Sequence, residues 1–267
     1  PKGTVERRSF SRDGDVARGP GIFDMKAGIV QAIYGLGAIE ERRHVEILIT
    51  ADEEVGSYAS RELIEERARA TRHVLVIEPS ADGGALKVAR KGVGTFRVDI
   101  AGKASHAGLE PEKGVNSLVE LAAQVQAITT IARPEIGTTV TPTVASAGTT
   151  ENVVPAAAHI IVDTRISEPN EKARVEAAFA SLTPTVAGAT VSVSGSINRP
   201  PMHESTALGL FAIAKGVADE LGITDLRGVA VGGGSDGNFT AAIGIPTLDG
   251  CGAVGGGAHA DSEHVVI

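Results

Sequence analysis

The chain has 267 residues, of which 42% are hydrophobic and 22% are charged, so its composition is globular and excludes a disordered or collagenous chain. The net charge is −8 and aromatic residues make up only 3%, which argues against a nucleic-acid partner because basic surfaces and stacking side chains are scarce. Apolar runs are too short to span a bilayer, so we expect a soluble protein with no membrane partner. A single cysteine, Cys251, excludes an internal disulfide and leaves the cellular localisation undetermined.

The first part of the chain alternates between helical and strand-like hydrophobic patterns. Residues 26–41 predict a helix, and the β-branched run at 45–50 predicts a buried strand. A second helix is predicted from a Ser57 cap to about residue 70, followed by a strand at 74–77. This alternation indicates an α/β domain with a mostly parallel sheet. It resumes later in the chain, with elements predicted at 206–221, 226–231, 236–243 and 246–249.

The pattern between these two parts is different and predicts an inserted domain. Its elements follow the order β-α-β-β-α-β, which is the ferredoxin-like arrangement of an antiparallel sheet covered by two helices. They are predicted at 95–100, 115–131, 138–146, 157–165, 170–182 and 190–193. We therefore expect a catalytic domain formed by residues 1–88 and 197–267, interrupted by an inserted domain at 89–196.

Acidic residues follow two of the predicted strands. Glu53 and Glu54 come after the strand at 45–50, and Glu78 comes directly after the strand at 74–77. Such acids are usually solvated turn or helix-start residues. Carboxylates at the ends of neighbouring strands would repel one another unless a cation offset their charge. The pairing therefore favours a metal site.

Two further candidate ligands lie after glycine-rich segments. Asp24 follows the glycines at 19–21, and His259 follows those at 255–257. Taken alone, Asp24 is more typical of a helix N-cap and His259 of a surface histidine. Their interpretation as ligands depends on the other motifs.

Six ordered segments together resemble the M20 metallopeptidases, and within that family the carboxypeptidase G2-like glutamate carboxypeptidases. The segments are 19–28, 50–57, 78–80, 104–108, 152–155 and 257–259. They extend over nearly the whole chain, and their order is far more specific than any single motif. The family's build, a dinuclear zinc catalytic domain with an inserted lid or dimerisation domain, agrees with the predicted organisation.

The resemblance implies a metal-binding role for four residues. Asp24 would bridge two zinc ions, Glu54 and His259 would bind one of them, and Glu78 would bind the other. Glu53 would be the general base that takes a proton from a water acidified by the metals. Mn²⁺ or Co²⁺ can replace Zn²⁺ with such carboxylate and imidazole ligands.

The resemblance also implies roles for residues that are not metal ligands. His106 would reach the partner subunit's site in a homodimer formed through this domain, and would polarise the scissile carbonyl. Asn152, Arg165 and Arg199 would hold the substrate, since an arginine can grip a terminal carboxylate with two hydrogen bonds. The glycine-rich segment 232–236 lacks the Lys-Ser/Thr ending of a P-loop and is expected to be a substrate-cleft turn.

Two further expectations follow from the family pattern. The peptide bond between Asp24 and Met25 is expected to be cis. The family's first metal motif, His-x-Asp, is missing, because residues 1–23 contain no histidine. We therefore expect a fragment that begins after that motif and stops before the closing helix, in which the second metal lacks a ligand and activity is impaired.

The leading functional hypothesis is a zinc-dependent hydrolase that releases a C-terminal amino acid, with glutamate preferred. A rival within the family is an N-acyl amino acid deacylase of the acetylornithine or succinyl-diaminopimelate type. A rival from another class is a metal- or ligand-binding homologue without turnover. The presence of Glu53 argues against this last hypothesis, because binding alone needs no general base.

Overall fold

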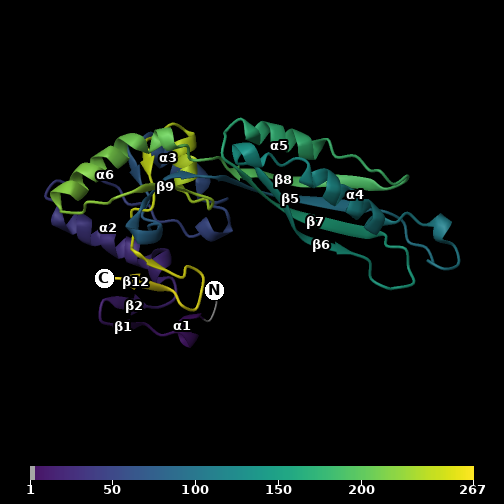
Figure 1. Ribbon diagram of the computed structural model, residues 1–267, viewed down its shortest axis with the longest axis horizontal. Coiled ribbons are helices and arrows are strands. Elements are labelled where there is room, and N and C mark those ends of the chain that lie inside the picture. Colours follow the sequence, from purple (N-terminus) through teal and green to yellow (C-terminus); the bar gives the residue numbers. More distant parts are fainter. Residues whose placement is uncertain (1–3) are drawn as a thin grey trace. The chain divides into compact units, whose positions relative to one another are not determined.

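The computed structural model describes residues 4–267, and these form two compact units (Figure 1). The first unit runs to Arg90 and resumes at Met202–Ile267, and the second is Lys91–Pro201. Within the described residues, no helix combines the length and the apolar character needed to cross a membrane.

The second unit is a four-stranded antiparallel sheet with two helices. The strand order is β6-β7-β5-β8, and the order along the chain is the predicted β-α-β-β-α-β. The elements are β5 (Gly92–Ala101), α4 (Ser117–Thr129), β6 (Thr139–Ala147), β7 (Ala157–Ile166), α5 (Glu171–Ala180) and β8 (Thr190–Arg199). Strand β8 continues six residues beyond the predicted end at 193, because its whole length pairs with β5.

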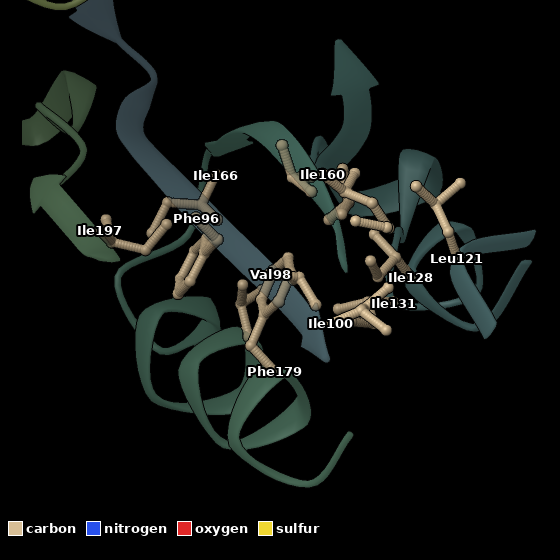
Figure 2. Close-up of a cluster of buried hydrophobic side chains, with 14 residues drawn as sticks. Phe96, Val98, Ile100, Leu121, Ile128, Ile131, Ile160, Ile166, Phe179 and Ile197 are labelled. Carbon is tan, nitrogen blue, oxygen red and sulfur yellow. The ribbon is translucent and has the colours of Figure 1, made fainter. Parts of the chain in front are cut away.

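One face of this sheet forms the core of the second unit against α4 and α5. Every second residue of β5, namely Phe96, Val98 and Ile100, is buried in it, as expected for a strand with one covered face. Figure 2 shows Phe96 beside Phe179 of α5, and the two rings stack with centroids 3.9 Å apart. The alternating pattern of β5 therefore determines which face receives the helices.

The first unit contains short strands and five α-helices among its described residues. The helices are α1 (Thr4–Arg7), α2 (Ala27–Ala38), α3 (Arg61–Arg69), α6 (Leu208–Glu220) and α7 (Gly237–Ala242). The strands are β1 (Ser11–Asp13), β2 (Val16–Arg18), β3 (Val74–Leu75), β4 (Leu86–Arg90), β9 (Gly228–Val231), β10 (Thr247–Leu248), β11 (Gly255–Gly256) and β12 (His264–Val266).

These strands pair in two ways. β3 pairs with β10 and β4 with β9, both in parallel, as the α/β pattern predicts. An additional antiparallel sheet, with the order β1-β2-β12-β11, was not predicted. In it Ala17 of β2 lies opposite Val265 of β12, so segments from opposite ends of the chain are held side by side.

Two predictions for this unit are wrong. Residues 45–50 form no strand and are largely exposed, with Ile49 64% exposed, because no described strand pairs with them. Ser57 does not cap a helix: α3 begins at Arg61, and the Asp52 carboxylate accepts hydrogen bonds from the N–H groups of Ala59 and Ser60 before it.

Candidate metal centre

The antiparallel sheet brings two glycine-rich loops together. The loop after β2 carries Asp24, and the loop between β11 and β12 carries His259. A third segment approaches through Gly28, where an added Cβ would lie 2.2 Å from the carbonyl oxygen of Ile77. Only glycine allows this approach, which places the start of α2 against the residue that precedes Glu78. The peptide bond between Asp24 and Met25 is cis, as expected from the resemblance.

Asp24, Glu54 and His259 converge on one point. The Nε2 atom of His259 lies 3.1 Å from Oε1 of Glu54 and 3.2 Å from Oδ2 of Asp24. One ligand atom from each of the three residues lies within 4.8 Å of the others. Two carboxylates and an imidazole with this spacing can hold a divalent cation such as zinc.

Glu53 and Glu78 line the same cavity, which has a volume of about 210 Å³. Burial, together with the negative charges of Asp24, Asp249 and Glu53, raises the pKa of Glu78 to about 8. Carboxylates that share a partly enclosed cavity repel one another unless a positive charge joins them. The donor set therefore fits a metal ion chemically.

His259 has both an electrostatic and a conformational signature of a site residue. The negative charge of Glu54 raises the pKa of His259, and Asp24 contributes in the same direction. Its backbone has a φ of 61°, a left-handed conformation that is uncommon for a residue other than glycine. Such backbone conformations cost about 1–3 kcal/mol and concentrate at functional sites.

Two cationic residues of β4, Lys87 and Arg90, also line the cavity but were not predicted. Burial lowers the pKa of Lys87, and the positive charge of Arg90 adds to this effect. Arg90 is buried and forms a salt bridge with Asp249. The sequence signal for both was a pair of cations within an otherwise apolar strand.

The segment that carries Glu53 and Glu54 is held by Asp236, which lies at the end of the glycine-rich turn 232–236. The hydroxyl of Thr50 donates a hydrogen bond of 3.0 Å to Oδ2 of Asp236, and the hydroxyl of Ser57 donates to Oδ1. These contacts fix both ends of the acidic segment. The turn was expected to be a substrate-cleft turn, and its Gly234 lines the cavity.

The remaining predicted site residues belong to the second unit. His106 and Asn152 are exposed neighbours, because the Ala107 N–H donates a hydrogen bond of 2.9 Å to the Asn152 carbonyl. The Nδ1 atom of His106 accepts hydrogen bonds from the N–H groups of Gly108 and Leu109, which leaves Nε2 pointing away from this turn. Arg165 forms a salt bridge with Asp163 of its own strand, at 2.8 Å.

Arg199, the third residue expected to hold the substrate, is largely buried. An arginine at the end of a strand is usually a surface residue, but Arg199 at the end of β8 is only 8% exposed. Its guanidinium is therefore a buried charge of the second unit.

Comparisons with known proteins agree with this fold. Residues 88–190 match the peptidase dimerisation domain family, M20_dimer. Carboxypeptidase G2 from Pseudomonas sp. (strain RS-16) is 34% identical over 99% of this chain and 66% of its own length. Acetylornithine deacetylase from Myxococcus xanthus is 28% identical over 54% of this chain and 40% of its own length.

The same fold occurs in the crystal structure of aminopeptidase PepT from Bacillus cereus ATCC 10987. The TM-score is 0.77 at 23% identity, and the match covers 97% of this chain and 71% of that chain. An α/β unit with an acidic, histidine-containing cluster and an inserted dimerisation domain defines the class of metal-dependent peptidases and amidohydrolases. The chain belongs to the M20 peptidase family. It spans about two thirds of the length of carboxypeptidase G2, at 66%.

Proposed function

We propose that the protein is a zinc-dependent hydrolase that cleaves a peptide or amide bond and releases a C-terminal amino acid, with glutamate preferred. The observation that carries the proposal is the convergence of Asp24, Glu54 and His259, with Glu53 and Glu78 lining the same cavity. The preference for glutamate rests on the resemblance to the glutamate carboxypeptidases, and the 34% identity to carboxypeptidase G2 is in line with it.

In this proposal Asp24 would bind both of two zinc ions, Glu54 and His259 would hold one, and Glu78 would hold the other. Bound zinc supplies Lewis-acid chemistry that acidifies a water molecule at neutral pH. The Glu53 carboxylate accepts the proton of the attacking water and delivers it to the amide nitrogen as the C–N bond breaks. Mn²⁺ or Co²⁺ would serve with the same ligands.

The second unit supplies the substrate contacts in this proposal. His106 donates from Nε2 to the scissile carbonyl oxygen, where negative charge develops, and it does so in the partner subunit of a homodimer. The match of residues 88–190 to a dimerisation domain supports this assembly. Asn152, Arg165 and Arg199 hold the carboxylate and backbone of a small peptide or N-acyl amino acid.

The deciding experiment is a substrate panel for the protein in its full natural length, loaded with zinc. The panel contains an N-acyl glutamate, N-acetylornithine and a dipeptide without glutamate. The proposal expects the highest kcat/KM for the N-acyl glutamate, with release of free glutamate. Turnover of none of the three by a protein that binds zinc would contradict a hydrolase and favour a binding homologue.

A deacylase is the second candidate, and the 28% identity to acetylornithine deacetylase favours it. It requires the same zinc ligands and the same proton transfer by Glu53, because both reactions hydrolyse an amide. The two differ only in which side of the amide bond is recognised. A higher kcat/KM for N-acetylornithine than for the N-acyl glutamate would establish this alternative.

A further inference from the structure

Glu263 is a buried carboxylate that contacts the Asp24 loop. It is 3% exposed and lies just before β12, shortly after His259 in the chain. Its Oε2 atom accepts a hydrogen bond of 2.7 Å from the N–H of Gly21. Its Oε1 atom accepts hydrogen bonds of 3.1 Å from the N–H groups of Phe23 and Asp24. One side chain therefore satisfies three backbone donors of a single loop.

This loop has little regular structure of its own to fix Asp24. The backbone of Gly21 is left-handed, with a φ of 70°, and Asp24 has the non-helical values φ −112° and ψ 94°. Buried N–H groups need partners, and an unpaired one costs about 1–3 kcal/mol. The Glu263 carboxylate supplies partners where neither a helix nor a strand does.

The sheet beside the loop does not replace this contact. The pairing of β2 with β12 runs from Val16 to Arg18 and stops before the loop begins. Glu263 directly precedes β12, so it continues the contact between the two segments at the point where the ladder ends. Its neighbour Val265 acts differently, since it packs in an apolar cluster with Ala17 and Phe23.

We propose that Glu263 is a positioning residue for the metal centre, holding the Asp24 backbone so that its carboxylate meets the ligand His259. The loop that supplies His259 would thereby also determine where Asp24 lies. The inference rests on the proposed metal site formed by Asp24, Glu54 and His259. It adds a residue that touches neither metal nor substrate.

The test is the substitution Glu263→Gln in the full-length protein. Glutamine keeps the size of the side chain, but it replaces one of the two acceptor oxygens with an NH₂ group. This donor then faces an N–H donor of the loop and cannot accept its hydrogen bond. Isothermal titration with Zn²⁺ is expected to show affinity about 10- to 100-fold lower, the range for residues that orient metal ligands. The matched control is Val265→Ala, which weakens the same region through packing and leaves the carboxylate in place.

A double-mutant cycle identifies the route of the effect. If Glu263 acts through Asp24, Glu263→Gln should cause little further loss of zinc affinity in an Asp24→Asn background. Full additivity of the two substitutions would overturn the proposal. Equal loss of affinity in Glu263→Gln and Val265→Ala would also overturn it, because a general loss of stability would then explain both.

Amide hydrogen exchange in the metal-free protein separates this inference from the metal site itself. Glu263→Gln should reduce the protection of the Gly21 and Asp24 amides, while Val265→Ala should leave these two unchanged. The Phe23 amide is left out of this comparison because Val265 packs in a cluster with Phe23. Unchanged protection in Glu263→Gln contradicts the positioning role. If the parent protein bound no zinc but Glu263→Gln still reduced the protection of these amides, the proposed metal site would fail. The role of Glu263 in holding the loop would stand.

Discussion

Arg90 and Asp249 form a buried two-point salt bridge at the edge of the cavity that Glu53 and Glu78 line. The Nε and Nη2 atoms of Arg90 each lie 2.7 Å from a carboxylate oxygen of Asp249, and the side chains are 5% and 0% exposed. Nη1 of Arg90 also donates a hydrogen bond of 3.1 Å to the carbonyl of Gly233. The pair therefore connects the end of β4 to the glycine-rich turn and to the segment after β10.

Removing one member of this pair should be strongly destabilising. Arg90→Met leaves the Asp249 carboxylate buried without its partner, and such a loss costs about 3–5 kcal/mol. Urea denaturation at neutral pH should show this decrease in the free energy of unfolding. The double variant Arg90→Met with Asp249→Leu should recover much of it, because no unpaired charge remains.

The matched control is the salt bridge between Arg67 and Glu46, which has the same two-point geometry but is exposed, at 45% and 41%. Arg67→Met should cost less than about 1 kcal/mol, because water screens the pair. Similar costs for Arg67→Met and Arg90→Met would show that the buried pair has no special structural role.

Glu53 and Glu54 should respond differently to substitution. Glu53→Gln is expected to retain zinc and to lower kcat by about 10²- to 10⁴-fold, because in the proposed function Glu53 moves a proton. Glu54→Gln is expected to weaken zinc binding, since its carboxylate lies with Asp24 and His259 in the ligand cluster. Titration calorimetry and kinetics of the two variants check this, and equal loss of zinc in both contradicts the division of roles.

Mixed dimers test whether His106 acts in the partner subunit. A His106→Ala chain and a Glu53→Ala chain are each expected to be nearly inactive. After co-assembly, one site of each heterodimer would contain an intact Glu53 and receive an intact His106, so activity should return. If purified heterodimers show no recovery, His106 does not act across the dimer.

Glu120 should make the second unit sensitive to acid. Burial alone would raise the pKa of Glu120, but hydrogen bonds from Gln124, Val186 and Thr185 outweigh this effect and hold the pKa below its usual range. Because the folded-state pKa lies below the unfolded value, the stabilisation is complete above the unfolded pKa of about 4.3 and is lost as the pH falls through the folded-state pKa.

The variant Glu120→Gln should therefore be less stable than the parent at pH 7, by about 1–3 kcal/mol for lost charged hydrogen bonds. The difference should shrink as the pH falls below 4. Denaturant unfolding at both pH values measures it. A difference that is the same at pH 7 and pH 3 would mean that the charge of Glu120 contributes nothing.

The second unit could be predicted well because its pattern is local. Alternation in β5 and helical spacing in α4 are each visible within about a dozen residues, and they agree with the fold that forms. The failure at 45–50 has the opposite cause. An apolar, β-branched run favours a strand, but a strand also needs a neighbour to pair with, and the described chain offers none to this segment.

For the candidate site, the sequence by itself determined which residue types could bind a metal and which family motifs contain them. It also indicated that Asp24 and His259 follow glycine-rich segments, whereas the strand expected before Glu54 does not form. Only the tertiary structure decided how they meet. The pairing of β2 with β12 brings the two loops together. The N–H groups of the Asp24 loop then donate hydrogen bonds to Glu263, which lies 239 to 242 residues away in the sequence. Glu263 and Asp249 gave no local signal of their roles, because a buried charge is recognisable only through the distant partners that neutralise it or hydrogen-bond with it.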